Sequence, residues 1–317
     1  MSYKIVVDSG CDLPQRLRED EQFVVVPLTL SVGGVDIVDD DSFNQKDFLK
    51  RVSESKECPK SACPSPERYL SEYENAAGDV YVITLSGRLS GSYNSALVAA
   101  DMYEEDGGSN HVHVFDSLSG CCGEAVIAMK IVECVEHGMG FDEVVKTVSQ
   151  FRDGMKTYFV LETLETLRKN GRLTNLQAIL ANVLSIKPVM SAREGEIIKL
   201  EQTRGINKAL KRMCEIILEN VKEPQNKVLA ISHCNCPERA EYVKRVFCLT
   251  SAASRMLSSW IQPESQLCMR TMAELLWRCN LILEYTCWRL THIFRHWGRI
   301  LPQCLNKTEK KSKMYCI

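Results

Sequence analysis

Short apolar runs that end in polar turn residues recur along the chain and alternate with segments of helical pattern. This alternation constrains the fold, because strands separated by crossover helices pair in parallel within one sheet. The runs are KIVVDSG at 4–10, VYVITLSG at 80–87, HVHVFDS at 111–117 and KVLAISH at 227–233. The helical segments between the first runs are 66–76, 92–102, 123–137 and 141–150. We therefore expect an α/β fold whose first domain has a parallel sheet.

The polar residues that follow these strands are expected to lie close together. In parallel α/β sheets the carboxyl ends of the strands share one edge, and ligands bind there. The loops concerned are Asp8-Ser9, 86–92 and Asp116-Ser117. The pattern therefore predicts a ligand site at this edge of the first domain.

The pattern changes after about Arg152. Strands are expected at 157–161, 187–190 and 197–200, and helices at 162–169, 173–184, 207–220 and from Pro237 onwards. We place a domain boundary near Gly154. Residues 1–154 then form the first α/β domain, and residues 155–246 form a second domain of mixed α/β composition.

The overall charge does not indicate a strongly charged partner. The 317 residues include 39 basic and 41 acidic side chains, a net charge of -2. Neither a nucleic acid nor stable insertion into a membrane is therefore expected. The first residues resemble no signal peptide, and no apolar run approaches the roughly 18 residues of a spanning helix. We expect a cytoplasmic protein whose 15 cysteines are reduced thiols.

The loop LSGRLSGSY at 85–93 combines small and hydroxyl residues directly before a predicted helix. Serine hydroxyls and the N–H groups of a helix N-terminus can bind an anion, because they donate without a counter-charge. An ordinary strand-to-helix turn with a capping serine would have the same pattern. The spacing fits neither a nucleophile elbow nor a Walker loop.

Three further segments permit a functional and a structural interpretation. PKSACPSP at 59–66 predicts an extended loop before a capped helix, or a linker stiffened by proline. KNGR at 169–172 ends a helix with Arg172 projecting beyond it, or is a solvated helix end. The cysteines at 121–122 and the HCNC segment at 233–236 lack the second Cys pair of a zinc site. We expect no metal and no cofactor.

Taken together, these segments resemble the DegV family of fatty-acid-binding proteins. The resemblance implies two α/β domains that enclose one long-chain fatty acid. Some members of the family are the acyl-presenting subunit of a bacterial fatty acid kinase, so a catalytic kinase subunit is the implied partner. The matching strings follow the order of the family: VVDSGCDLP (6–14), SACPSP (61–66), ITLSGRLSGSYNSA (83–96), VFDSLSGCCG (114–123), ETLETLRKNGRL (162–173), LSIKPVM (184–190) and TRGINKAL (203–210).

The resemblance also implies roles for individual residues. The carboxylate of the fatty acid would be bound by Ser61 and by the turn of Ser90, Gly91 and Ser92, with Arg204 near the head group. Arg172 would contact the partner kinase.

One segment departs from the family pattern. Where the family has T-S-Q-P-S, this chain has Ser-Ala-Cys-Pro-Ser. Ser61 keeps a hydroxyl, whereas Ala62 and Cys63 lack the polar groups of the family residues. We expect altered recognition of the head group.

The composition changes abruptly near Phe247. Residues 1–246 contain 16 of the 17 glycines and no tryptophan, with 37 acidic and 29 basic residues. Residues 247–317 contain all four tryptophans, six of the cysteines and one glycine, with ten basic and four acidic residues. A small basic domain, a tail that binds a partner and translation in a shifted reading frame are the alternatives.

We favour the shifted frame. Codons permitted for residues 260–280, regrouped in another frame, can encode DTAGISTVYANDGGVIVAV and then a stop. This string has the glycine-rich loop and the apolar last strand with which the family ends. We therefore interpret 247–317 as a frame-shifted, non-native tail, and expect the second domain to be truncated and to lack its final strand.

The function expected is a binding protein that is not itself an enzyme. The alternatives are a serine esterase that uses Ser90 and a kinase related to the dihydroxyacetone kinases. An esterase requires a base, and no motif places a histidine next to Ser90. The histidines considered are His111, His113, His137 and His233. A third alternative is a protein-interaction module formed by the basic tail.

Overall fold

The computed structural model of the chain describes residues 2–173, 186–222, 227–249 and 280–285. In the first domain, four strands lie in the order β2 (Phe23–Val26), β1 (Tyr3–Asp8), β6 (Asp79–Thr84) and β7 (Val112–Asp116). All neighbouring pairs are parallel. The α/β fold with a parallel first sheet is therefore confirmed.

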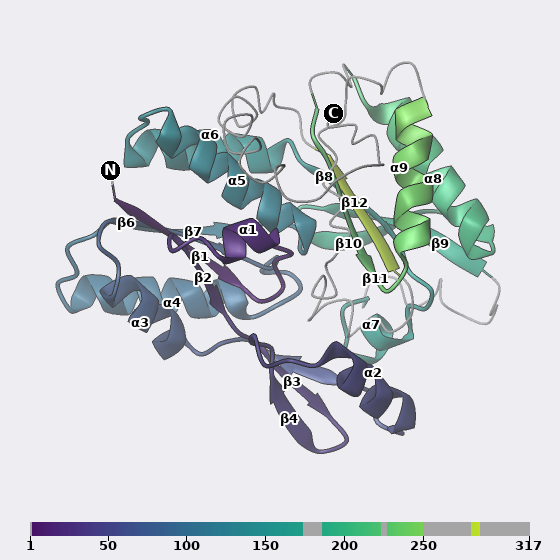
Figure 1. Ribbon diagram of the computed structural model, residues 1–317, viewed down its shortest axis with the longest axis horizontal. Coiled ribbons are helices and arrows are strands. Elements are labelled where there is room, and N and C mark those ends of the chain that lie inside the picture. Colours follow the sequence, from purple (N-terminus) through teal and green to yellow (C-terminus); the bar gives the residue numbers. More distant parts are fainter. Residues whose placement is uncertain (1, 174–185, 223–226, 250–279, 286–317) are drawn as a thin grey trace, which may run out of the picture.

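Helices cover both faces of this first sheet (Figure 1). The helices α3 (Pro66–Glu74) and α4 (Ser92–Glu105) pack on one face, and α5 (Cys122–Glu136) and α6 (Phe141–Asp153) lie on the other. Side chains of β1 alternate between them: Val6 packs with α3 and α4, whereas Ile5 and Val7 join the cluster of α5. A short helix, α1 (Gln15–Arg18), follows β1.

The second sheet has the order β10 (Glu196–Arg204), β9 (Ile186–Arg193), β8 (Lys156–Val160), β12 (Asn280–Tyr285) and β11 (Leu229–Cys234). Each neighbouring pair is antiparallel. The strand formed by the run at 227–233 therefore has an antiparallel neighbour, unlike the strands of the three earlier runs. An apolar run bounded by turn residues does not specify the direction of the strand beside it. The helices α8 (Ile206–Asn220) and α9 (Pro237–Leu249) pack on the outer face.

The helix α5 lies between the two sheets (Figure 1). Twelve of its fifteen residues are buried. One apolar cluster joins Ile83 and Phe115 of the first sheet, Ile127 of α5, and Phe159 and Met190 of the second. The two sheets therefore share a core, and the division of the chain near residue 154 stays a prediction.

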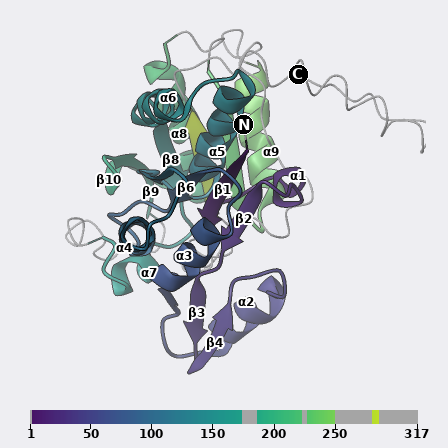
Figure 2. The same ribbon diagram turned by 90° about the vertical axis from the view of Figure 1, so that its left-hand side faces the viewer.

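A small third sheet of β4 (Val35–Val38), β3 (Thr29–Val32) and β5 (Lys60–Ala62) projects from the main body with α2 (Gln45–Glu54) (Figure 2). Its pairs are antiparallel. It has its own apolar cluster, centred on Leu30 and Phe48. Sequence analysis did not predict these strands, because each has only three or four residues.

Within the tail, residues 280–285 form β12 between β8 and β11. We expected the final strand of the second domain to be missing, and this position of the sheet is instead filled. Strands pair through backbone groups, so the apolar segment NLILEY can pair without a matching family sequence. Residues 250–279 and 286–317 lie outside the described residues, as does most of the helix expected at 173–184. The frame-shift interpretation therefore stays a prediction.

Candidate functional site

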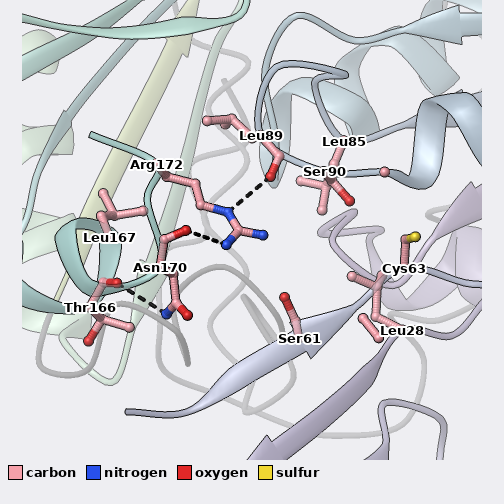
Figure 3. A pocket seen from close by; sticks show the side chains of 12 residues that line it. Leu28, Ser61, Cys63, Leu85, Leu89, Ser90, Thr166, Leu167, Asn170 and Arg172 are labelled. Atoms are coloured by element: carbon pink, nitrogen blue, oxygen red, sulfur yellow. Dashed lines mark hydrogen bonds between the residues drawn. The ribbon is translucent and has the colours of Figure 1, made fainter. Parts of the chain in front are cut away.

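A cavity of about 240 Å³ is lined by three parts of the chain (Figure 3). One part is β5 and its neighbours, one is the loop after β6, and one is α7 (Glu165–Lys169) with the residues that follow it. The lining residues are Leu28, Ser61, Ala62, Cys63, Leu85, Leu89, Ser90, Gly91, Thr166, Leu167, Asn170 and Arg172. The cavity therefore lies where the loop after β6, the segment around α7 and the small third sheet meet.

The loop after β6 is fixed by a buried carboxyl group at the end of β1. Asp8 accepts hydrogen bonds from the N–H groups of Gly10 and Leu85, each at 2.9 Å. The N–H group of Gly87 donates to Asp116 at the end of β7, at 3.1 Å. The expectation that the polar loops after these three strands meet at one edge is confirmed.

Ser90 and Gly91 line the cavity from this loop. The hydroxyl oxygen of Ser90 accepts the N–H group of Ser92 at 3.2 Å and lies 3.0 Å from the Ser92 hydroxyl oxygen. A Cβ atom at Gly91 would lie 2.8 Å from the Sγ atom of Cys63, so a side chain there would crowd the opposite wall. Ser92 itself is fully buried and is not among the described lining residues.

Ser61 reaches the cavity from β5, where it pairs with Leu30 of β3. Its hydroxyl oxygen points into the cavity (Figure 3). Ala62 and Cys63 also line this wall and are exposed. The wall therefore offers one hydroxyl where the family pattern has more polar groups.

Arg172 lies between Leu89 of the loop after β6 and Asn170, which follows α7 (Figure 3). Its Nε atom donates to the carbonyl oxygen of Leu89 at 3.3 Å, and its Nη1 atom donates to the carbonyl oxygen of Asn170. The turn before it has Gly171 at φ +74°, the left-handed conformation expected at this helix end. The guanidinium group therefore joins a turn of the second domain to the loop that carries Ser90.

Asn170 is a lining residue to which sequence analysis gave no role beyond the helix end. Its Nδ2 atom donates to the carbonyl oxygens of Pro59 at 3.0 Å and Thr166 at 3.1 Å, and lies 3.5 Å from the Sγ atom of Cys58. It therefore ties α7 to the segment that leads into β5. An Asn at a helix end was the available signal, but nothing local shows that Pro59 lies beside it.

A second, apolar cavity of about 30 Å³ shares Leu89 and Leu167 with the first. Its other walls come from the loop after β7 and from β8, β9 and β10. They are Leu118, Ser119, Gly120, Cys121, Thr157, Phe159, Ala192, Gly195 and Ile197. The first cavity, which contains the serine hydroxyls, is thus followed by an apolar space between the two sheets.

The structure does not bring Arg204 to these cavities. Arg204 is the last residue of β10, is exposed, and is not among the described residues that line either cavity. Its proposed place near the head group stays a prediction.

None of the four histidines that the structure describes lies beside Ser90. His111 pairs with Asp79 at 2.9 Å, and His137 contacts the carbonyl oxygen of Glu133 at 2.6 Å. Neither these two nor His113 and His233 line the cavity. In the described segments, the esterase alternative therefore has no base beside Ser90.

The same segments contain no group of three or more His, Cys, Asp or Glu side chains placed to hold a metal ion. None of their helices has the length and apolar character to cross a bilayer.

A cavity with serine hydroxyls and a guanidinium group, next to an apolar space between two α/β domains, defines a small-molecule-binding protein of the α/β class. Comparison with known proteins narrows this class. A sequence model described as that of uncharacterised proteins of the DegV family matches residues 2–257, about four fifths of the chain. The chain belongs to the DegV family, which confirms the resemblance found in its motifs.

Two streptococcal relatives show the extent of the sequence similarity. A DegV domain-containing protein of Streptococcus pneumoniae is 37% identical over 213 residues, which cover 66% of this chain and 75% of that protein. A DegV domain-containing protein of Streptococcus gordonii is 34% identical over 254 residues, covering 78% of this chain and 89% of that protein.

Crystal structures of two similar proteins contain fatty acids. A DegV family protein of Ruminococcus gnavus, refined with vaccenic acid, has a TM-score of 0.82 and 39% identity, covering 90% of this chain and 99% of that one. The fatty acid kinase (Fak) B3 protein of Streptococcus pneumoniae, loaded with linoleic acid, has a TM-score of 0.80 and 28% identity, covering 90% of this chain and 100% of that one.

Proposed function

We propose that this chain binds one long-chain fatty acid and presents its carboxylate to a partner kinase for acyl phosphate formation. The observation that carries the proposal is the adjacency of the two cavities. The hydroxyls of Ser61 and Ser90 line a space that shares Leu89 and Leu167 with an apolar one. The fatty acids bound by the similar proteins of Ruminococcus gnavus and Streptococcus pneumoniae support the same ligand class.

The acyl chain supplies most of the affinity. Burial of about 14 methylene groups at about 0.8 kcal/mol each stabilises the complex by about 11 kcal/mol before ordering costs. A hydrogen bond to a charged head group contributes only about 1.5–3 kcal/mol. The polar groups of the first cavity therefore determine the orientation of the ligand more than its affinity.

The apolar cavity must widen to hold a long chain. Its volume of about 30 Å³ is far below the roughly 300 Å³ at which ligand pockets begin. Leu89 and Leu167 separate it from the larger cavity, and Phe159 and Ile197 form part of its inner wall. Rotation of these side chains opens the path of the acyl chain.

Native mass spectrometry tests the ligand class directly. Protein purified without added lipid is expected to carry one fatty acid per chain, because an apolar pocket in a lipid-containing cell does not stay empty. Apo protein alone, with no uptake of added palmitate or oleate, would overturn the proposal.

A matched pair of serine variants tests the head-group site. Ser90→Ala is expected to weaken fatty-acid binding by about 1–2 kcal/mol, because the carboxylate loses one donor. Ser53→Ala is the control, since Ser53 is an exposed residue of α2 whose hydroxyl donates to the carbonyl oxygen of Lys50 at 2.6 Å. Loss of an ester-hydrolysis activity in Ser90→Ala would favour the esterase instead.

Substitution of Arg172 tests whether binding of the fatty acid can be separated from its presentation to the kinase. We expect a separate kinase subunit to carry out catalysis and Arg172 to contact that subunit. The guanidinium group of Arg172 lines the cavity and donates to the carbonyl oxygens of Leu89 and Asn170. Arg172→Ala is expected to reduce acyl phosphate formation by a fatty acid kinase catalytic subunit, with fatty-acid affinity unchanged. An equal loss of affinity and phosphorylation would show that Arg172 serves only the lipid.

A further inference from the structure

Behind the cavity wall, Ser90 is connected to a buried carboxyl group. The hydroxyl oxygens of Ser90 and Ser92 lie 3.0 Å apart, and hydrogen bonding by the Ser92 side chain lowers the pKa of the Asp8 carboxyl. Ser90 lines the cavity, whereas Ser92 and Asp8 are 0% exposed. Three polar side chains therefore lead from the cavity into the interior of the first domain.

A second carboxyl group lies beside Asp8. Glu124, in the first turn of α5, is also 0% exposed, and hydrogen bonding by its side chain acts on Asp8. This hydrogen bonding lowers the pKa of Asp8, against the effect of burial. Glu124 therefore favours the ionised form of Asp8 before a ligand binds.

The other titratable groups around Asp8 do not neutralise it. Cys11 follows β1 and Tyr69 comes from α3, and burial raises the pKa of both side chains. The charges of Asp8 and Glu124 raise both pKa values further, whereas hydrogen bonding with Ser92 lowers that of Tyr69. Burial outweighs this effect, so the thiol and the phenol stay neutral. Burial also raises the pKa of Asp8 to about 6, against the opposing effect of its hydrogen bonds.

The direction of the two serine hydroxyls depends on the proton of Asp8. Each hydroxyl has one hydrogen to donate. When Asp8 is ionised, Ser92 donates to it and Ser90 donates to Ser92. When Asp8 carries the proton, Asp8 donates to Ser92, Ser92 to Ser90, and the hydrogen of Ser90 is directed into the cavity. A carboxylate in the cavity can only accept, so it stabilises the second arrangement.

We propose that Asp8, Ser92 and Ser90 form a hydrogen-bond relay that takes up one proton when the carboxylate of the ligand binds. The inference rests on the proposed function and deepens it. Asp8 and Ser92 are positioning residues, because they direct the Ser90 hydroxyl without touching the ligand. The proton stays on the protein, so the ligand is held as an ionised carboxylate, the form that can attack a phosphoryl group.

The relay makes affinity depend on pH. Below about pH 6, Asp8 already holds the proton before the ligand binds, since its pKa is raised to about 6. Above that pH, binding must draw a proton from solvent. Affinity therefore falls as pH rises, by up to about tenfold per pH unit when one full proton is taken up.

A ligand that does not titrate isolates the proton taken up by the protein. Hexadecane sulfonate stays ionised, so any proton uptake on binding belongs to the protein and not to the head group. Calorimetric titrations at about pH 7.5, in two buffers of different ionisation enthalpy, give the number of protons per ligand. We expect about one for the wild type. Ser92→Ala interrupts the relay and is expected to bind the sulfonate without uptake.

Two variants control for the substitution itself. Ser95→Ala removes a second hydroxyl of α4, which contacts the Sγ atom of Cys63 at 3.7 Å, and is expected to keep the proton uptake. Ser92→Thr keeps the hydroxyl group and is expected to keep the proton uptake as well. Infrared difference spectra of the wild type, with and without the sulfonate, avoid variants altogether and should show a carboxyl band of a protonated acid appearing on binding.

The outcomes separate the relay from the binding function. Sulfonate binding by the wild type without proton uptake, or equal uptake by the wild type and Ser92→Ala, overturns the relay and leaves fatty-acid binding intact. Failure of the wild type to bind both palmitate and the sulfonate overturns the proposed function itself.

Discussion

The first sheet pairs four strands in parallel, whereas the second pairs five antiparallel strands and includes one from residues 280–285. Parallel strands end at one common edge, so the loops after β1, β6 and β7 meet, and the loop after β6 contributes Ser90 to the cavity. The antiparallel sheet has no such edge, and it supplies the apolar wall of Phe159 and Ile197. The comparison indicates that the parallel sheet positions the loop that carries Ser90, whereas the antiparallel sheet forms the apolar wall.

The helix α5 limits how far the two sheets can be treated as separate units. Its buried residues belong to the cluster that contains side chains of both sheets. The shared core, the close contact at Gly195 and a surface ion pair can each couple the two sheets.

The largest effect is expected from Ile127→Ala. Ile127 is 0% exposed in the cluster that joins the sheets, so the substitution is expected to cost about 2–5 kcal/mol of unfolding free energy. Calorimetry should show one cooperative transition at a lower temperature. Val98→Ala, at a 38% exposed position of α4, is the control with little change. Two separate transitions, with only one shifted, would show that the domains unfold independently.

Gly195→Ala tests the contact between the β9–β10 turn and the loop after β6. Gly195 has φ +78°, its carbonyl oxygen accepts the Ser86 hydroxyl at 3.0 Å, and a Cβ atom would lie 2.4 Å from that hydroxyl oxygen. Crowding of this kind costs about 1–3 kcal/mol. Gly138→Ala provides the control, because Gly138 has φ +77° with nothing within 4 Å. Equal destabilisation in urea would mean that backbone strain explains the whole effect.

The acid stability of the two sheets can be compared through one histidine in each. Burial lowers the pKa of His113 in β7 and of His233 in β11 from 6.5, and the charge of Arg152 lowers that of His113 further. Both are neutral in the folded state and gain a proton more readily when unfolded. The contribution of these two histidines to the free energy of unfolding is therefore fully present above pH 6.5 and is lost as pH falls below that value. His113→Gln and His233→Gln should each flatten the profile of denaturation midpoint against pH, and an unchanged slope in both would contradict the burial argument.

Sequence analysis located the parts of the site that local patterns specify. Three strands with polar ends imply a shared edge, and this brings Ser90 and Gly91 to the cavity that Ser61 and Arg172 also line. The same reasoning did not show that Ser92 is fully buried, because its burial depends on how α4 packs against the end of β1.

The remaining parts depend on contacts between distant residues. Asn170 reaches Pro59 across 111 residues of sequence, and the third sheet forms from strands too short to show a period. The order of the second sheet is likewise set by pairing and not by pattern, since β12 enters between β8 and β11. No window of the sequence contains both partners of these contacts.

The smallest effect is expected from Arg88→Ala. Arg88 lies in the loop after β6 and forms an ion pair with Glu196 of β10 at 3.8 Å, so it joins the two domains through their surfaces. The two side chains are 63% and 49% exposed, and exposed pairs contribute about 0–1 kcal/mol because water and salt screen them. We expect a loss of about 0.5 kcal/mol or less, and a coupling energy near zero from urea unfolding of Arg88→Ala, Glu196→Ala and the double variant. If the coupling instead exceeded about 1 kcal/mol and disappeared in high salt, charges at the domain surfaces would contribute to joining the sheets together with the core around α5.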